Sequence, residues 1–268
     1  MFGNQQGYFE PIDASVNEVD EAIINAYVAK VFGWMFIGLL VTAITTVAII
    51  YGINVSFAFT EFINTAMQMV LIVFIAQVVL VGFISARVQK MNPFTAKVLY
   101  LIYAMSNGLT VGLAATMFAV QAGGGLNLLG MAFGITAVSF GVMAAYGYFT
   151  GKDLTHFSSL LRMALFGLIL AIVVNMFLGS SMMDLLICVV GLFLFLGLTA
   201  ADTNKIKNHF ARVAVGSGGR MNSDGTYAEE NPEQAALASN LAIYGALILY
   251  LDFINIFMFI LRLLGRRR

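Results

Sequence analysis

The segment LAIYGALILYLDFINIFMFILRLLG, Leu241 to Gly265, has the composition of a membrane-spanning helix but carries a carboxylate, Asp252, near its middle. No other charged residue lies between Glu233 and Arg262. A helix needs about 20 mostly apolar residues to cross a bilayer. Only helices and closed barrels can cross, because every backbone N–H and C=O must be paired inside the membrane, and an apolar run without alternation favours a helix. The segment therefore predicts a spanning helix whose carboxylate needs an explanation.

The rest of the chain repeats this apolar composition. Of its 268 residues 60% are hydrophobic and only 10% are charged, and the mean hydropathy is +0.89. Long windows hold no charged residue: 31–60, 62–86, 98–151, 163–183, 185–201 and the Asp252 segment. The window 98–151 is long enough for two helices, broken at Gln121-Ala-Gly-Gly-Gly125. The sequence thus predicts an all-α membrane protein with seven transmembrane helices.

These windows also predict how the chain is divided. We expect spans near 31–51, 66–86, 98–120, 127–149, 160–178, 184–207 and 237–263. An acidic N-terminal tail (1–29) would precede one seven-helix transmembrane domain (30–265), and a basic tail (266–268) would follow it. Glycines and an acidic, proline-containing run predict a flexible loop at 208–234 inside that domain.

Small residues recur at helical spacing in two of the expected spans, at Gly108-Leu-Thr-Val-Gly112 and Gly130-Met-Ala-Phe-Gly134. Such residues let helix backbones approach closely where lipid provides no hydrophobic force for association. Both patterns predict close helix contacts within a bundle.

The basic residues give conflicting signals for orientation. Lys and Arg in short loops stay on the cytoplasmic side. With seven spans, one side of the membrane receives ten of them: Lys30, Arg87, Lys90, Lys97, Lys152, Arg162, Lys205, Lys207, Arg212 and Arg220. This predicts a cytoplasmic N-terminus, but it places four C-terminal arginines outside. Either the last segment folds back around Asp252, or the C-terminal charges invert the topology, and the sequence leaves both open.

A second carboxylate, Asp202, lies toward the end of the sixth expected span. A charged Asp at mid-bilayer costs about 2.5–3.5 kcal/mol on insertion scales, so Asp252 should face protein or a wet cavity. If the last two spans pack as antiparallel neighbours, Asp202 and Asp252 can meet below the membrane surface. Two carboxylates in contact cannot both ionise easily, so they would share a proton and titrate as a pair. This predicts a pH sensor.

Each aspartate also has a purely structural interpretation. Asp252 could accept hydrogen bonds from neighbours such as Asn255, and Asp202 could cap its helix or pair with Lys205. For either residue alone the structural interpretation is the simpler one. Because the two lie on consecutive spans, we favour the pair.

Three segments closely resemble the signatures of the Bax inhibitor-1 family: Tyr146-Gly-Tyr-Phe-Thr-Gly-Lys-Asp-Leu-Thr155, Gly197-Leu-Thr-Ala-Ala-Asp-Thr-Asn-Lys-Ile-Lys207 and Leu249-Tyr-Leu-Asp-Phe-Ile-Asn-Ile-Phe257. Gly108-Leu-Thr resembles the family's third-span motif. The likeness runs in order from about Tyr27 to Gly265. Within the family, the sequence most resembles the bacterial inner-membrane branch. It implies seven helices with the last one central, in a multi-pass protein of the inner membrane.

The resemblance also implies a function, a pH-sensitive leak of calcium ions. An aspartate pair on helices six and seven is the family's pH sensor and lines its pore, and it matches Asp202 and Asp252, which would contact Ca²⁺ only transiently. An arginine at the end of helix two locks the closed state, and Arg87 is the candidate here. A glutamate inside helix two matches Gln77, a candidate pore position. That glutamine, and Ala201 in place of an aromatic residue, depart from the family pattern.

Two other functions compete with a calcium leak. Intramembrane aspartyl proteases also place two aspartates on consecutive spans, but their Tyr-Asp and Gly-x-Gly-Asp contexts differ from Ala201-Asp202 and Leu251-Asp252, so we expect no enzyme. The main alternative is a regulatory protein that modulates a membrane-protein quality-control protease without conducting ions. No Walker motif is present. We expect the lipid bilayer and calcium ions as partners, no cofactor and no nucleic acid.

Overall fold

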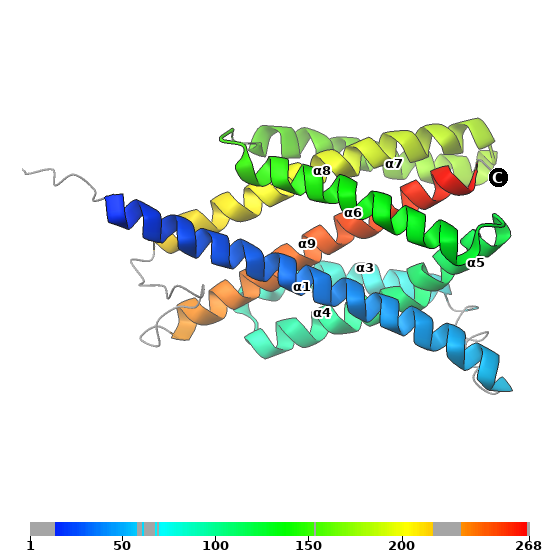
Figure 1. Ribbon diagram of the computed structural model, residues 1–268, viewed down its shortest axis with the longest axis horizontal. Helices are drawn as coiled ribbons and strands as arrows, with labels where there is room; N and C mark the ends of the chain where they lie inside the picture. Colours follow the sequence, from blue (N-terminus) through cyan, green and yellow to red (C-terminus); the bar gives the residue numbers. More distant parts are fainter. Residues whose placement is uncertain are drawn as a thin grey trace, which may run out of the picture.

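The computed structural model describes residues 14–57, 61, 68, 70–152, 154–216 and 232–266, and this part of the chain is a bundle of helices (Figure 1). The described elements are the α-helices α1 (Ala14–Val55), α3 (Val70–Arg87), α4 (Pro93–Asn107), α5 (Leu113–Gln121), α6 (Gly125–Phe149), α7 (Thr155–Leu178), α8 (Ser181–Gly216) and α9 (Pro232–Gly265), a 3₁₀ turn η1 (Val88–Lys90) and a π-helical turn η2 (Gly108–Gly112).

Seven helices of the described residues are long and apolar enough to cross a bilayer, which confirms the expected all-α architecture. They comprise Ile24–Gly52, Ile72–Lys90, Pro93–Gln121, Gly125–Phe149, His156–Leu178, Ser181–Asn208 and Ala235–Gly265. The third span combines α4, η2 and α5. The second begins later than the expected 66–86, and positions 66, 67 and 69 lie outside the described residues.

The helix breaks follow local chemistry. The predicted break at Gln121–Gly125 is confirmed, since α5 ends at Gln121 and α6 begins at Gly125. Gly123 and Gly125 have φ angles of 70° and 48°, which residues with a Cβ rarely adopt. At the start of α4, the Asn92 side chain accepts a hydrogen bond from the backbone N–H of Phe94, and Pro93 occupies the first helical position.

Two expected boundaries differ from the structure. The expected loop 208–234 is helical at both ends, because α8 continues to Gly216 and α9 begins at Pro232, a residue well suited to the first position of a helix. Residues 217–231 lie outside the described part. The expected N-terminal tail 1–29 is helical from Ala14, where α1 begins ahead of the first span.

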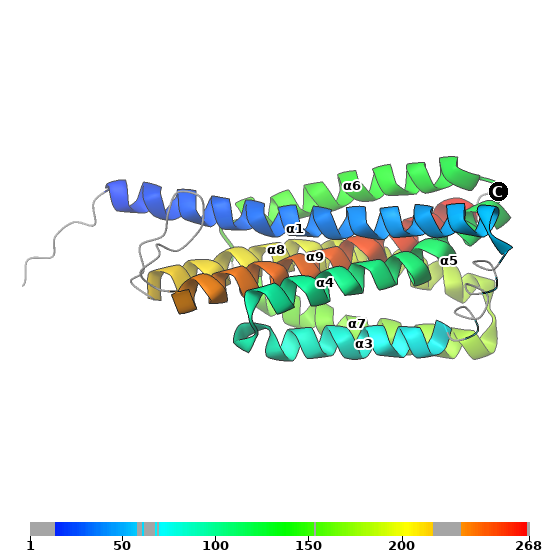
Figure 2. The same cartoon turned by 90° about the horizontal axis from the view of Figure 1, so that it is seen from below.

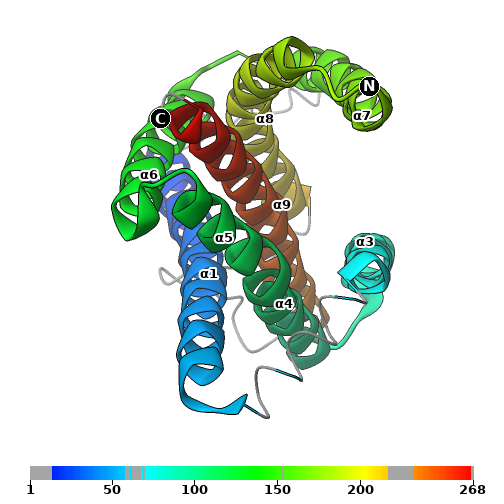
Figure 3. The same ribbon diagram turned by 90° about the vertical axis from the view of Figure 1, so that its right-hand side faces the viewer.

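The last helix, α9, runs through the bundle and contacts α1, α4, α5, α6 and α8 as well as the turn η1 (Figure 3). Many of the fully buried large side chains lie on it: Ile243, Leu247, Leu249, Tyr250, Ile256 and Leu261. Views along two axes show α9 crossing the length of the bundle between its neighbours (Figures 1 and 2). The central position of the last helix among all the other spans, which the resemblance implies, stays a prediction.

One of the two small-residue patterns marks a close helix contact. A Cβ on Gly108 would lie 2.7 Å from the carbonyl oxygen of Thr42, and a Cβ on Gly112 would overlap the Thr46 side chain, so η2 packs directly on α1. A Cβ on Gly130 or on Gly134 would meet nothing within 4 Å. The second pattern therefore marks no close contact within the described chain.

Hydrogen bonds join the spans where lipid supplies no hydrophobic force. The buried hydroxyl of Thr42 on α1 donates to the Ala104 carbonyl of α4 at 2.9 Å and lies 2.7 Å from the Tyr250 hydroxyl of α9. The Tyr100 hydroxyl donates to the Trp34 carbonyl at 2.9 Å. Such bonds contribute about 0.6–2 kcal/mol each between transmembrane helices. They fix α1, α4 and α9 to one another.

The structure excludes one of the two explanations for the conflicting charge signals. The last span does not fold back around Asp252, because α9 continues without a break from Pro232 to Gly265. Its ends lie at opposite ends of the bundle (Figures 1 and 2). Arg262 and Arg266 pair there with Asp184 at the start of α8, with nitrogen–oxygen distances of 3.8 Å and 3.3 Å. Their charges are thus partly neutralised at the end opposite the basic loops.

An inverted topology would place ten basic residues outside and the other topology only four, so we predict a cytoplasmic Lys152 and a C-terminus outside the cytoplasm. The Lys152 loop carries the Lys/Arg bias that controls insertion, and seven crossings place the two ends of the chain on opposite sides. Topology reporters fused after Lys152 and after Arg268 measure both. An external Lys152 reporter, or two reporters on the same side, would contradict this orientation.

Candidate functional site

Asp252 lies in the interior of the bundle, about one turn beyond the middle of the long helix α9. Only 4% of its surface is exposed, and its Oδ2 atom has no hydrogen-bond partner. An unpaired carboxylate inside a protein is costly unless it is protonated, paired or hydrated. Because ionisable groups within spans usually line wet cavities or ion pathways, Asp252 is the first candidate for a functional residue.

Asp202 on α8 faces the same cavity as Asp252. The cavity has a volume of about 480 Å³ and lies between α7, α8 and α9. It is lined by Arg162, Leu165, Leu168, Ile169, Ile172, Phe195, Leu198, Asp202, Lys205, Tyr244, Ile248, Leu251, Asp252, Asn255 and Phe259. We call it the carboxylate cavity. The structure thus places in one cavity lining the two aspartates that the sequence placed on consecutive spans, and the charge of Asp202 acts on Asp252.

Two cations share the carboxylate cavity with the aspartates. Arg162 on α7 and Lys205 on α8 both line it, and both act on the charge of Asp202. Asp252 lies deeper in the bundle, and Asp202, not a cation, is the charge that acts on it. The charges are therefore unevenly distributed: basic side chains lie beside Asp202, and the carboxylate of Asp252 beyond it has no such partner.

A smaller cavity of about 160 Å³ adjoins the same aspartate. It lies beside α1 and η1, where Tyr27 and Gln89 line it. Four residues line both cavities: Asp202, Lys205, Tyr244 and Ile248. These four side chains form the boundary between the two spaces, so a movement of any of them would alter the connection between the cavities.

The segment of α8 that carries Asp202 is anchored to the α6–α7 connection. Asn204 donates to the Gly147 carbonyl at 3.1 Å, and its Oδ1 accepts from the backbone N–H of Leu154 at 3.3 Å. Lys207 donates to the Tyr148 carbonyl at 3.0 Å. A Cβ on Gly147 would overlap the backbone carbonyl of Ala200, so α6 and α8 touch backbone to backbone there. Two of the three signature segments therefore hold each other in place.

The structural interpretation of Asp252 required a donor such as Asn255. The Asn255 amide instead donates to the Leu251 carbonyl of its own helix at 2.8 Å. Its side chain lines the carboxylate cavity, so its amide oxygen adds a neutral oxygen near the two carboxylates. Oxygen atoms of this kind are the ligands that Ca²⁺ prefers, but a stable site takes six to eight of them.

The other two residues singled out from the sequence lie elsewhere. Gln77 on α3 is 5% exposed and donates to the hydroxyls of Ser106 at 2.6 Å and Thr110 at 2.9 Å, next to the π-helical turn η2. Arg87 is exposed at the C-terminal end of α3. Neither is among the residues that line the carboxylate cavity. Their roles as pore position and lock stay predictions.

Sequence reasoning missed Arg162 and Tyr244 as neighbours of the aspartates. One signal was available for Arg162, because it lies inside the expected span 160–178, where a charge needs a partner. Tyr244 gave no signal, since a tyrosine near the start of a span is ordinary at a membrane interface. The packing of α7 on α8 brings Arg162 to Asp202, and the packing of α9 on α8 brings Tyr244 there.

These features define a class: a multi-pass helical membrane protein with two carboxylates facing one cavity between its helices. Within this class the family is shown by sequence comparison. The sequence model of the family described as "Inhibitor of apoptosis-promoting Bax1" matches residues 24–268. The chain belongs to this family, the Bax inhibitor-1 family.

Relatives from several bacteria match over almost their full length. The chain is 36% identical to the inner membrane protein YbhL of Escherichia coli K12 over 245 residues, which cover 91% of this chain and 93% of the relative. It is 36% identical to a protein of Borreliella burgdorferi over 266 residues, covering 96% and 99%. It is 32% identical to protein RP147 of Rickettsia prowazekii over 259 residues, covering 95% of each chain.

Proposed function

We propose that this protein is a pH-sensitive calcium leak channel of the bacterial inner membrane, a passive pathway and not an enzyme. The observation that carries the proposal is the carboxylate cavity, in which Asp202 and the unpartnered Asp252 face the same space. The location rests on the likeness to YbhL, which is itself named an inner membrane protein.

The carboxylates supply both parts of the mechanism. Their oxygens offer Ca²⁺ hard ligands but too few for a stable site, so an ion would contact them only transiently. Their protonation would change how α8 packs against α9, because two bare charges repel across the cavity and protonation of either carboxylate removes that repulsion. A ligand or proton shifts a two-state equilibrium only by its different affinity for the two states, and this repulsion provides the difference.

The cavities favour a route along α9. The small cavity beside α1 and η1 and the larger carboxylate cavity share Asp202 and Tyr244 in their walls. An ion entering beside Gln89 would pass Asp202 before it reached Asp252. Opening would require Tyr244 or Ile248 to move from the boundary between the cavities.

We predict that the purified protein carries Ca²⁺ down its gradient in liposomes loaded with a calcium-sensitive dye. Influx should exceed that of protein-free liposomes and should change with pH, since the carboxylate pair titrates. The dye signal over a range from acidic to neutral pH measures this. Influx no greater than that of protein-free liposomes at every pH would exclude a leak channel and favour the regulatory alternative, modulation of a membrane protease.

A further inference from the structure

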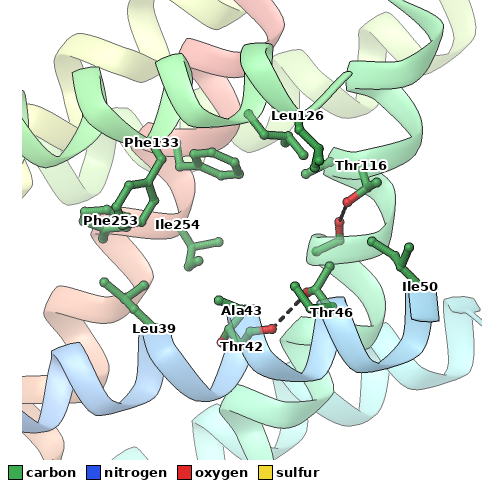
Figure 4. A pocket seen from close by; sticks show the side chains of 15 residues that line it. Leu39, Thr42, Ala43, Thr46, Ile50, Thr116, Leu126, Phe133, Phe253 and Ile254 are labelled. Atoms are coloured by element: carbon green, nitrogen blue, oxygen red, sulfur yellow. Dashed lines mark hydrogen bonds between the residues drawn. The ribbon is translucent and has the colours of Figure 1, made fainter. Parts of the chain in front are cut away.

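A third cavity lies on the side of α9 opposite the carboxylate cavity, and it is not part of the proposed ion route. It has a volume of about 210 Å³, its walls come from α1 and α6, and its floor comes from α5 and α9. Figure 4 shows Leu39, Thr46, Leu126 and Phe133 around it, with Phe253 and Ile254 of α9 at one side. We call it the apolar groove.

The groove offers little polar surface to a ligand. Three threonines line it, but each hydroxyl donates to a backbone carbonyl: Thr42 to Gly38 and Ala104, Thr46 to Thr42 and Gly108, and Thr116 to Gly112. The other lining residues are aliphatic or aromatic, apart from Gly112. A cavity of this chemistry excludes water and accepts apolar ligands, as cavities of about 150 Å³ do in other proteins.

The groove opens sideways. Val47 on α1 and Leu126 on α6 at its edges are 66% and 79% exposed, whereas Ala115 and Phe253 on its floor are 2% and 4% exposed. Closer to the N-terminal part of α1, the rings of Phe32 and Phe140 meet edge to face at 6.4 Å and join α1 to α6. All the elements that line the groove belong to membrane spans. Its opening therefore faces lipid in the half of the membrane nearer the Gln121–Gly125 break.

We propose that the apolar groove binds one acyl chain of a membrane phospholipid. Hydrocarbon chains surround the opening at this depth, they match the apolar walls, and they need no hydrogen-bond partner. An empty groove would forfeit van der Waals contacts along its whole lining, and an acyl chain restores them.

The bound chain would support α9 on the side opposite its carboxylate. Asp252 lines the carboxylate cavity, and the next residue, Phe253, lines the apolar groove. A chain that fills the groove resists movement of α9 toward α1 and α6. This link to gating rests on the proposed function, whereas the binding of the chain does not.

Photocrosslinking tests the site on the wild-type protein. Vesicles of phosphatidylethanolamine and phosphatidylglycerol would include a phosphatidylethanolamine with a diazirine in the middle of one acyl chain. We expect crosslinks on the floor residues Phe253 and Ala115, which surface lipid does not reach. Peptide mapping by mass spectrometry measures them.

Two matched variants on α1 provide the control. Ala43 lines the groove and Ala48 lies on the outer lipid-facing surface of the same helix, and both are exposed. Ala43→Phe should lower floor labelling severalfold, whereas Ala48→Phe should leave it unchanged. Absence of floor labelling in the wild type, or equal labelling in all three proteins, would overturn the proposal.

A fluorescence measurement supplies an independent readout. In a Trp34→Phe, Phe253→Trp protein the only tryptophan lies on the groove floor. Lipids with brominated acyl chains should lower its emission about two-fold by contact if a chain fills this apolar cavity, and adding Ala43→Phe should restore the emission. Emission that is independent of bromination would overturn the proposal even if calcium influx is observed, so the two proposals fail separately.

Discussion

Asp252→Asn should remove the pH dependence of calcium influx and give, at every pH, the influx expected of the wild-type protein when its carboxylate pair is protonated. Asparagine has the size of aspartate and the charge of its protonated form, so it fixes the pair in the state with the least repulsion. A change of about 1.4 kcal/mol in a gating equilibrium alters the open fraction about tenfold. We therefore expect a wild-type pH dependence of about this size to be lost in Asp252→Asn and in Asp202→Asn. Dye-loaded liposomes at acidic and neutral pH measure it.

The matched control is Asp184→Asn, the same substitution at the other end of α8. Asp184 pairs with Arg262 and Arg266 at the surface of the bundle and lies outside the carboxylate cavity. Its variant should retain the wild-type pH dependence. A pH dependence that survives both Asp202→Asn and Asp252→Asn would assign the sensor to other groups.

The same assay shows which of two cations, Arg87 or Arg162, pairs with the aspartates in the closed state. Arg87 was selected by its likeness to a family position, whereas Arg162 lines the cavity and acts on the charge of Asp202. If the partner of the pair is the cation in the cavity, Arg162→Gln should shift the pH profile and Arg87→Gln should not. The opposite pattern would support the lock inferred from the family.

The sequence was sufficient for the spans because each depends on local properties. An uncharged window of about 20 residues has to be a helix in lipid, and the glycines at 121–125 and Gly179 break helices through their own backbone freedom. The two boundaries that differ lie where no membrane constrains the chain, at Gly216 and at Ala14. The composition of these segments shows only that they are polar. A polar segment outside the membrane can be either a loop or a helix, so composition does not fix where the helix ends.

The candidate site was only half predictable because it depends on which helices become neighbours. Asp202 and Asp252 could be paired from the sequence, since consecutive spans commonly pack side by side. Arg162 comes from α7, and its approach to Asp202 depends on how three helices rotate about their axes. The glycine patterns show the same limit: a Cβ on Gly108 would clash with α1, whereas a Cβ on Gly130 would meet nothing within 4 Å, although the two patterns have identical spacing.

Gly147→Ala should destabilise the protein strongly. The new Cβ would overlap the carbonyl oxygen of Ala200 and lie 2.9 Å from its Cα, and both are backbone atoms that no side-chain rotation can move. Overpacking of this kind costs about 1–3 kcal/mol, which corresponds to a fall in Tm of roughly 3–10 °C for a chain of this size. Thermal unfolding of the purified variant in detergent measures it.

Gly141→Ala on the same helix is the matched control for this loss of stability. A Cβ on Gly141 would meet nothing within 4 Å, and alanine favours a helix over glycine by about 1 kcal/mol, so its Tm should stay the same or rise. Equal falls in Tm for both variants would show that the contact of α6 with α8 does not determine the result.

The Gly147 contact also links stability to the proposed gate. The Gly147 carbonyl accepts a hydrogen bond from Asn204, two residues after Asp202, so pushing α8 away from α6 displaces the segment that carries the carboxylate. Gly147→Ala should therefore change the pH profile of calcium influx as well as lower the Tm. Gly141→Ala should keep the wild-type pH profile and should not lower the Tm. A Gly147→Ala protein with lowered Tm but the wild-type pH profile would show that the carboxylate pair is positioned by α7 and α9 and not by the anchor on α6.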